Sequence, residues 1–309
     1  MRMRAECVSC LINRVIYEAG LVDEKTFSKK SKKSFRFTGI KDSCNDKLVE
    51  KAVKEALNIL AKEYSYDANS ILVATKVHRR VYEIIENPDP YKDIKERSNR
   101  IALSLIPKAE KFINDSKDKL RAAVICAIVG NVFDFGIKSS IAAPEKLGDN
   151  FEKMCENGLN VDDTEKIRKY LKKNSRVLFF TDNCGEIVFD KLLCREIKKF
   201  GVHLTVVVRE SPIMNDATVE DAEKLGFEDA ADEIMLSSNA VGIDFNEISD
   251  DLKKRIENAD LIICKGMGMY EAFCEKKYRP VVHLLRTKCM PVADDMGLPE
   301  NISVAKMYE

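Results

Sequence analysis

The 309-residue sequence predicts a mixed α/β protein, with a helical first half followed by a doubly wound, mostly parallel sheet. Two observations lead to this prediction. Before about residue 175 the apolar residues recur with the period of a helix, and we find no strong strand signal there. After it, short β-rich runs alternate with amphipathic segments, the pattern of a parallel sheet covered on both faces. We therefore expect a helical subdomain over 1–170 and an α/β subdomain over 171–309.

The first half contains several helical segments. Residues 46–61 place their apolar side chains on one helix face, and 71–85 continue in the same manner. After a break rich in proline, we expect a helix from Tyr91 that ends near Pro107. The segment 120–129 is strongly apolar and rich in alanine, which favours a buried helix over a strand.

The second half alternates strands and helices joined by short links. Because consecutive parallel strands are joined by right-handed crossovers, their carboxyl ends share one edge of the sheet. The expected strands are 177–181, 203–208, 233–236, 261–264 and 280–285, and the expected helices are 186–200, 218–225 and 248–258.

Composition excludes several classes of protein. Lys+Arg and Asp+Glu both number 51, so the net charge of zero gives no bulk attraction to nucleic acid or to an anionic membrane. No apolar stretch approaches the length of a membrane span, and the first residues lack the apolar core of a secretory signal. Ten cysteines are too sparse for a disulfide scaffold, which favours a cytoplasmic protein.

An Asp-Asn pair directly follows the first strand of the predicted sheet. Asp182 and Asn183 begin a strand-to-helix turn that continues through Gly185 and Glu186. Ligands of doubly wound sheets bind at the carboxyl ends of strands. Carboxylate and amide oxygens there are hard ligands suited to divalent metals such as Mg or Mn. The turn therefore indicates a metal-assisted reaction, and we expect a phosphorylated substrate.

Three more strands end in polar residues that suit a phosphate bridged to a metal, since cations and the N–H groups of helix starts bind phosphate oxygens. Each feature alone also has a structural explanation: a helix N-cap, a surface lysine, a turn, or an ion-pair network. Their coincidence on one edge favours the functional interpretation. The segments are Arg209 with Asn215, Asp216 and Thr218; Lys265 with Gly266 and Gly268; and Arg286 with Lys288.

These motifs together resemble the damage-control phosphatase family, also known as domain of unknown function 89. The resemblance covers nearly the whole chain, and the N-terminal Cys pair is similar to the stand-alone prokaryotic and archaeal branch. The matching motifs are Cys7-x-x-Cys10, Asp89-Pro90-Tyr91 with Lys95 and Asn99, Gly130-Asn131-x-x-Asp134-Phe135-Gly136, Asp182-Asn183-x-Gly185-Glu186, Asn215-Asp216-x-Thr218 and Lys265-Gly266-x-Gly268.

The resemblance implies a helical part packed on a Rossmann-like α/β part, with a divalent metal (Mn, Co, Ni or Mg) in the cleft. It places the metal ligands on Asp182, Asn183 and Asp216, and a phosphate-contacting lysine on Lys265. It also implies hydrolysis of small phosphorylated metabolites, such as sugar phosphates and damaged or surplus cofactor precursors. Met267 and Met269 depart from the family, because more polar residues often follow the Lys-Gly turn.

Further roles are expected around this site. Glu186 either orients a ligand or water, or is a first-turn acid favoured by the helix dipole. Either water or Asp182 attacks the phosphorus. Asn131 and Asp134, three residues apart, either contact substrate or end a helix with buried polar partners. The expected substrate- or phosphate-binding residues are Lys265, Gly266, Asn131, Asp134, Arg209 and Arg286.

The pair Cys7 and Cys10 has two explanations. The thiols supply half of a zinc site or a redox pair, or they are reduced thiols at a helix start. Two other functions are also open. The first is an S-adenosylmethionine-dependent carboxyl methyltransferase, although the Gly-rich loop it would need after the first strand is absent. The second is a non-enzymatic metal-binding protein. The sequence leaves the oligomeric state open.

Overall fold

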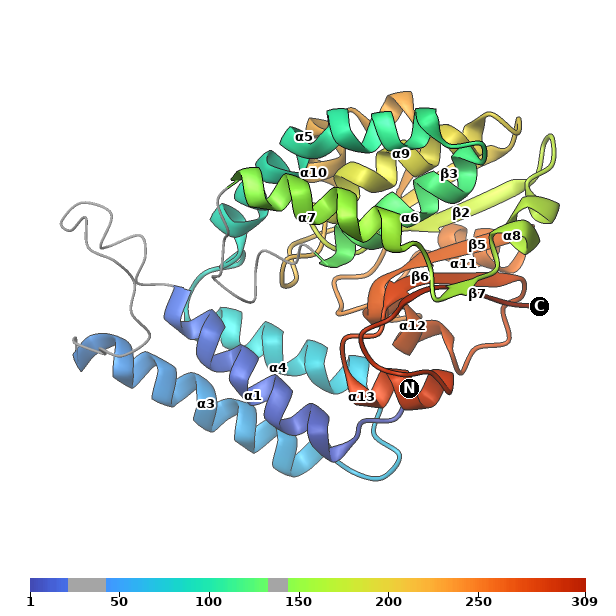
Figure 1. Ribbon diagram of the computed structural model, residues 1–309. Coiled ribbons are helices and arrows are strands. Elements are labelled where there is room, and N and C mark those ends of the chain that lie inside the picture. Colours follow the sequence, from blue (N-terminus) through green and yellow to red (C-terminus); the bar gives the residue numbers. More distant parts are fainter. Residues whose placement is uncertain (22–42, 133–143) are drawn as a thin grey trace. The chain divides into compact units, whose positions relative to one another are not determined.

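The computed structural model describes residues 1–21, 43–132 and 144–309 (Figure 1). The chain divides into two compact units, Met1–Lys92 and Asp93–Glu309. The helices between residues 93 and 170 thus group with the sheet. The boundary expected at residue 170 separates helix from sheet by secondary structure and stays a prediction.

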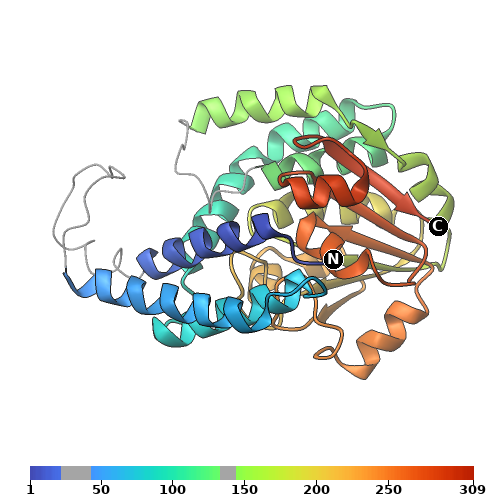
Figure 2. The same ribbon diagram turned by 90° about the horizontal axis from the view of Figure 1, so that it is seen from below.

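The first unit is a helical layer of α1 (Ala5–Gly20), α3 (Ser43–Glu63) and α4 (Ser70–Ile84), which lie side by side (Figure 2). Its interior holds a polar cluster. Glu18 is fully buried, with Oε2 2.8 Å from Nδ1 of His78, and the Tyr91 hydroxyl donates to its Oε1 at 3.2 Å. Because both carboxylate oxygens are bonded, this buried acid is satisfied within the unit.

The second unit has a seven-stranded sheet within its described residues, in the order β1-β7-β6-β5-β2-β3-β4. Strands β2 to β6 run parallel, whereas β7 is antiparallel to β6 and pairs in parallel with β1. The mixed α/β class and the mostly parallel sheet are therefore confirmed. The strands are β1 (Val161–Asp162), β2 (Arg176–Phe180), β3 (His203–Val208), β4 (Glu233–Leu236), β5 (Leu261–Lys265), β6 (Val281–Arg286) and β7 (Ser303–Tyr308).

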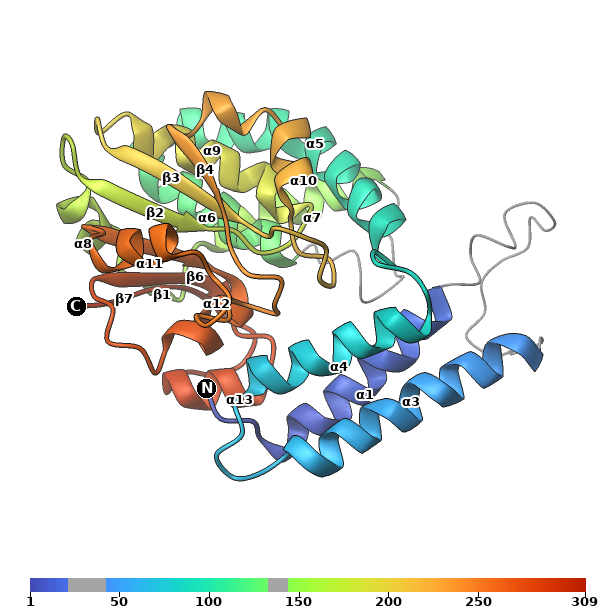
Figure 3. The ribbon, with the colours of Figure 1, turned by 180° about the vertical axis from the view of Figure 1, so that it is seen from behind.

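Helices cover both faces of this sheet. Helices α6 and α9 pack on one face, and α11 and α12 lie on the other (Figure 3). The helices of the unit are α5 (Lys92–Asp115), α6 (Lys119–Val132), α7 (Pro144–Asn157), α8 (Thr164–Tyr170), α9 (Glu186–Lys198), α10 (Val219–Lys224), α11 (Asp250–Glu257), α12 (Gly266–Phe273) and α13 (Met290–Met296).

Two expectations about the elements were wrong. Helix α5 continues through Pro107 to Asp115, because Pro107 is on the exposed face, where water can satisfy the Leu103 carbonyl that loses its N–H partner. Strand signals were also missed. Strand β1 is only two residues long, and β7 places buried side chains at consecutive positions, so neither alternates as a half-buried strand does.

The close approach of α6 and α9 positions the site. A Cβ atom added to Gly130 on α6 would lie 2.6 Å from the Phe189 ring and 3.4 Å from the Glu186 Cα atom of α9. The glycine therefore lets α6 bring the next residue, Asn131, onto the start of α9. None of the described helices is long and apolar enough to cross a membrane.

Candidate functional site at the carboxyl edge of the sheet

The four polar segments expected at one edge do lie together. They follow β6, β5, β2 and β3, which are consecutive neighbours in the sheet and all run in the same direction. We call the charged side chains gathered there the carboxyl-edge cluster. Its members are Asp182, Glu186, Asp190, Arg209, Asp216 and Lys265, all of them buried.

Backbone hydrogen bonds join the two turns that carry the predicted metal ligands. Asn183 and Asp216 form an isolated antiparallel bridge. The Ala217 N–H donates to the Asp182 carbonyl and the Cys184 N–H donates to the Asn215 carbonyl, each at 2.8 Å. The turn after β2 is thus fixed to the turn after β3, which places Asp182, Asn183 and Asp216 side by side.

Each of these three side chains is held through one atom. Asp182 Oδ2 accepts from the amide nitrogens of Asn183 at 2.7 Å and Asn131 at 3.3 Å, and Asp216 Oδ2 accepts from Arg209 Nε at 2.8 Å. Within the described part of the chain, no hydrogen bond is made by Oδ1 of Asp182, Asn183 or Asp216. One oxygen on each predicted ligand is therefore available.

Gly266 supports the Asp182 carboxylate. Its φ of +71° is in the left-handed region, and an added Cβ atom would lie 1.8 Å from Asp182 Oδ2. The start of α12 can approach the carboxylate only because this residue has no side chain. Gly266, expected to bind phosphate, is thus placed directly against a predicted metal ligand.

Lys265 lies beneath this surface. It is fully buried, and its Nζ donates to Asp190 Oδ1 at 2.7 Å, to the Ala127 carbonyl at 3.1 Å and, at shorter range, to Glu186 Oε1. The resemblance implied a phosphate-contacting lysine at this position. In the structure its ammonium is directed at protein oxygens.

Glu186 connects Lys265 to the predicted ligands. Its Oε2 accepts from the Asn131 amide nitrogen at 2.6 Å and from that of Asn183 at 3.2 Å. Asn131 also contributes its carbonyl, which accepts a short hydrogen bond from Lys288 Nζ. The side chain of Glu186 therefore lies behind the predicted ligands, 1% exposed.

Burial and mutual repulsion disfavour charge on the acids. Burial, with the neighbouring Asp216 and Glu186 carboxylates, raises the pKa of Asp182 well above its usual range. Burial also raises the pKa of Asp216, against the opposing effect of Arg209. Burial disfavours the Lys265 ammonium, but the Asp190 and Glu186 carboxylates outweigh it and raise its pKa. Charge on Asp182 and Asp216 is therefore disfavoured unless a further positive charge lies beside them.

These features fit a divalent cation. The open oxygens are hard donors, and a cation would offset the repulsion that raises the Asp182 and Asp216 pKa values. Two of the three predicted ligands are acids, and the third is the amide oxygen of Asn183. Accordingly, no group of three or more His, Cys, Asp and Glu side chains in the described residues is arranged to hold a metal ion.

Of the other predicted residues, the two arginines are at the same edge of the sheet. Arg209 is buried behind Asp216, and Arg286 ends β6 half-buried. Cys7 and Cys10 are on α1 in the first unit, and neither forms a disulfide with a described residue. Asp134 lies outside the described residues.

The interpretation of the sequence missed two supporting residues. Asp190 is on the same face of α9 as Glu186, four residues later, and a pair of acids at this spacing repels on an isolated helix. That repulsion was a signal for a buried cation beside them. Asn99, named above only within a family motif, accepts from the Gly185 N–H at 2.6 Å and so supports the turn after β2.

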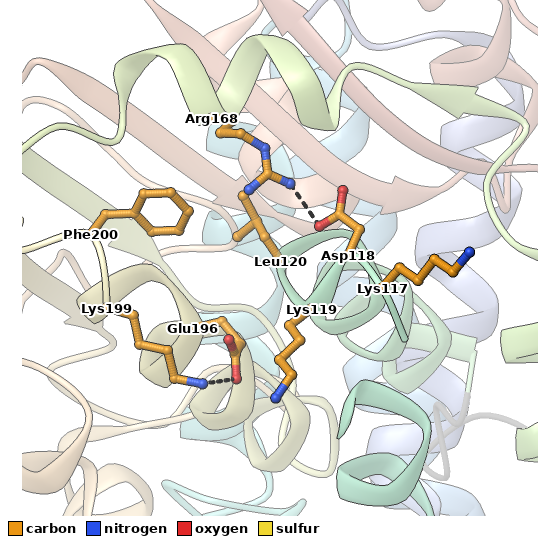
Figure 4. Close-up of a pocket in the computed structure, with 8 residues that line it drawn as sticks. All are labelled: Lys117, Asp118, Lys119, Leu120, Arg168, Glu196, Lys199 and Phe200. Carbon is orange, nitrogen blue, oxygen red and sulfur yellow. Dashed lines mark hydrogen bonds and ion pairs between the residues drawn. The ribbon is translucent and has the colours of Figure 1, made fainter. Parts of the chain in front are cut away.

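A hollow of about 460 Å³ lies away from this edge (Figure 4). It contains two ion pairs, Arg168 with Asp118 at 2.7 Å and Lys199 with Glu196 at 2.5 Å. We call it the outer hollow. It contains none of the predicted site residues, so its size does not indicate the place of the chemistry.

Comparison with known proteins agrees with the geometry. The model of the damage-control phosphatase ARMT1-like domain matches residues 3–304. A damage-control phosphatase from Archaeoglobus fulgidus is 38% identical over the whole of both chains, and one from Pyrococcus horikoshii is 32% identical over 81% of this chain and 85% of its own. The crystal structure of a DUF89 family protein from P. horikoshii covers both chains fully, with a TM-score of 0.85 and 28% identity.

The chain belongs to the damage-control phosphatase family. It is thus a phosphatase of metabolite repair, and the family implies small phosphorylated metabolites as its class of substrate. Phosphatases of this family are generally metal-dependent.

Proposed function

We propose that this protein is a metal-dependent phosphomonoester hydrolase, and that Asp182, Asn183 and Asp216 hold one divalent cation. The observation that supports this most directly is the open Oδ1 oxygen on each of the three side chains. Mn, Co, Ni and Mg all suit an oxygen donor set, and the choice among them depends on geometry and supply.

When bound, such a cation stabilises the negative charge that develops on phosphoryl oxygens in the transition state. The chain's own residues prepare the site for it. Arg209 holds Asp216 through two nitrogens of its guanidinium, Nε and Nη2, each 2.8 Å from Oδ2. The amide nitrogens of Asn131 and Asn183 hold Asp182 from the other side.

The phosphate needs cationic partners beyond the metal. Arg286 at the end of β6 is half-buried, and no ion pair involves it within the described ranges. We assign Arg286 to the substrate phosphate, because a guanidinium can donate two parallel hydrogen bonds to phosphate oxygens. The substrates we propose are sugar phosphates or damaged or surplus cofactor precursors, in line with the damage-control phosphatases that this chain resembles.

The test is phosphate release from a panel of sugar phosphates and phosphorylated cofactor precursors, metal-free and with Mn, Co, Ni or Mg. We expect release only with metal, and at least about 100-fold less from Asp182→Asn, because the cation loses a charged ligand. Asp118→Asn, in the outer hollow, is the matched control and should retain activity. Release that is equal without metal, or unchanged in Asp182→Asn, would contradict the proposal.

A further inference from the structure

Lys265 has no hydrogen left for a phosphate. An ammonium group has three donors. In the structure all three have protein acceptors, on Ala127, Glu186 and Asp190, and the side chain is 0% exposed. Contact with a substrate oxygen would require Lys265 to leave one of these acceptors and to cross the Glu186 side chain that separates it from the predicted ligands.

Among the described residues, Lys265 is the only member of the cluster that forms a hydrogen bond with Asp190. Its Oδ1 accepts from Nζ at 2.7 Å, and its Oδ2 is buried without a hydrogen-bond partner among the described residues. A buried acceptor left unbonded costs stability. A buried acid at this position is explained if its hydrogen bond to Lys265 holds that lysine in place for another part of the site.

The other residue that Lys265 holds is Glu186. Lys265 binds Oε1, which fixes the carboxylate so that Oε2 receives the amide nitrogens of both Asn131 and Asn183. An amide has its oxygen on the opposite side from its nitrogen. Turning the Asn183 nitrogen toward Glu186 Oε2 and Asp182 Oδ2 therefore turns its Oδ1 away from these two acceptors and leaves it open for a ligand.

We propose that Lys265 and Asp190 are positioning residues that act through Glu186 to orient the Asn183 amide toward the cation, and that Lys265 does not contact the substrate phosphate. This inference rests on the proposed metal site at Asp182, Asn183 and Asp216. It assigns a role to Asp190, and it replaces phosphate contact as the role of Lys265.

The two roles of Lys265 predict different measurements. A positioning lysine affects Mn²⁺ binding when no substrate is present, whereas a phosphate-contacting lysine affects inhibition by inorganic phosphate at saturating Mn²⁺. The double variant Asp190→Asn/Lys265→Met removes one charge of each sign, so it changes the geometry while the net charge of the site is kept. The matched control is Glu233→Gln/Arg255→Met, which removes a bidentate ion pair with bonds of 2.5 and 3.0 Å between β4 and α11.

We expect the Mn²⁺ dissociation constant of the double variant to rise about tenfold, the low end for changes behind a metal ligand, while the control stays within about twofold of wild type. The inhibition constant of phosphate at saturating Mn²⁺ should not change. An unchanged Mn²⁺ constant together with weaker phosphate inhibition would overturn the inference and leave the metal site standing. If the wild-type protein binds no Mn²⁺, the proposed metal site is contradicted, and with it the inference that depends on that site.

A second pair of variants keeps the test valid if the double variant does not fold. Asp190→Asn and Asp190→Ala remove the same charge, but only asparagine keeps an acceptor for Lys265 Nζ. We expect Asp190→Ala to bind Mn²⁺ several-fold more weakly than Asp190→Asn. Equal affinities of the two variants, both shown to be folded by circular dichroism, would contradict a positioning role for Asp190.

Discussion

The carboxyl-edge cluster and the outer hollow both gather charged side chains in the same unit, but they do so differently. The outer hollow pairs its acids one to one with cations, and the partners Arg168 and Asp118 are about one-third exposed. The carboxyl-edge cluster, as defined above, buries four acids together with two cations, Arg209 and Lys265. Burying unbalanced charge is costly, whereas exposed pairs contribute little. The difference favours the carboxyl-edge cluster as the place where a cation would bind.

The largest difference in the free energy of unfolding is expected between two variants, one that removes a lysine from the carboxyl-edge cluster and one that removes a lysine from the outer hollow. Lys265→Met leaves Glu186 and Asp190 buried without their cation, so the free energy of unfolding should fall by about 3–5 kcal/mol. Lys199→Met removes only an exposed partner of Glu196 and should cost less than about 1 kcal/mol. Urea unfolding in EDTA measures both, and equal losses would remove the distinction between the two clusters.

A smaller loss of stability is expected when a methyl group is added at Gly266. Gly266→Ala has both a positive φ and a clash with the Asp182 carboxylate, so it should cost about 2–3 kcal/mol and weaken Mn²⁺ binding strongly. Gly297 is the matched control, since its φ is +67° but nothing lies within 4 Å of an added Cβ atom. Gly297→Ala should cost only about 1 kcal/mol for the backbone conformation and leave Mn²⁺ binding unchanged.

The smallest effect for a single step is the change in stability per pH unit. Burial raises the pKa of Asp190 to about 7, despite the lowering effect of Lys265. Between the unfolded value, about 3.9, and that pKa the folded state binds more protons than the unfolded one, so this group makes stability fall as pH rises. The slope is at most about 1.4 kcal/mol per pH unit.

The measurement is the difference in unfolding free energy between wild type and Asp190→Asn, in EDTA, at pH 5 and pH 7. Taking the difference removes the contributions of other groups, such as His283, whose pKa burial lowers to about 3. We expect Asp190→Asn to gain stability relative to wild type as the pH rises. A difference that does not vary with pH would show that Asp190 titrates in the fold as it does in the unfolded chain.

Much of the fold was predictable because its signals are local. Strands β2, β3, β5 and β6 are apolar runs that end at polar turns, and one topological rule places their carboxyl ends on a common edge. The meeting of Asp182, Asn183 and Asp216 follows from that rule.

The interior of the site was less predictable, because it depends on packing between distant segments. Lys265 follows an apolar run, and nothing local indicates that α6 and α9 enclose it. Asp190 is a polar residue within an amphipathic helix, and it is buried only because Gly130 lets α6 approach α9 closely. The antiparallel strand β7 depends on pairing with β6, which its own sequence pattern does not reveal.

The central claim is that Asp182, Asn183 and Asp216 hold one divalent cation. Equilibrium dialysis of Mn²⁺ against the wild-type protein and Asp216→Asn tests it most directly, because asparagine keeps an acceptor for Arg209 while removing the charge on the ligand. We predict one Mn²⁺ per chain for wild type and binding at least about 100-fold weaker in the variant. Equal Mn²⁺ binding by both proteins, with the variant shown to be folded, would contradict the assignment.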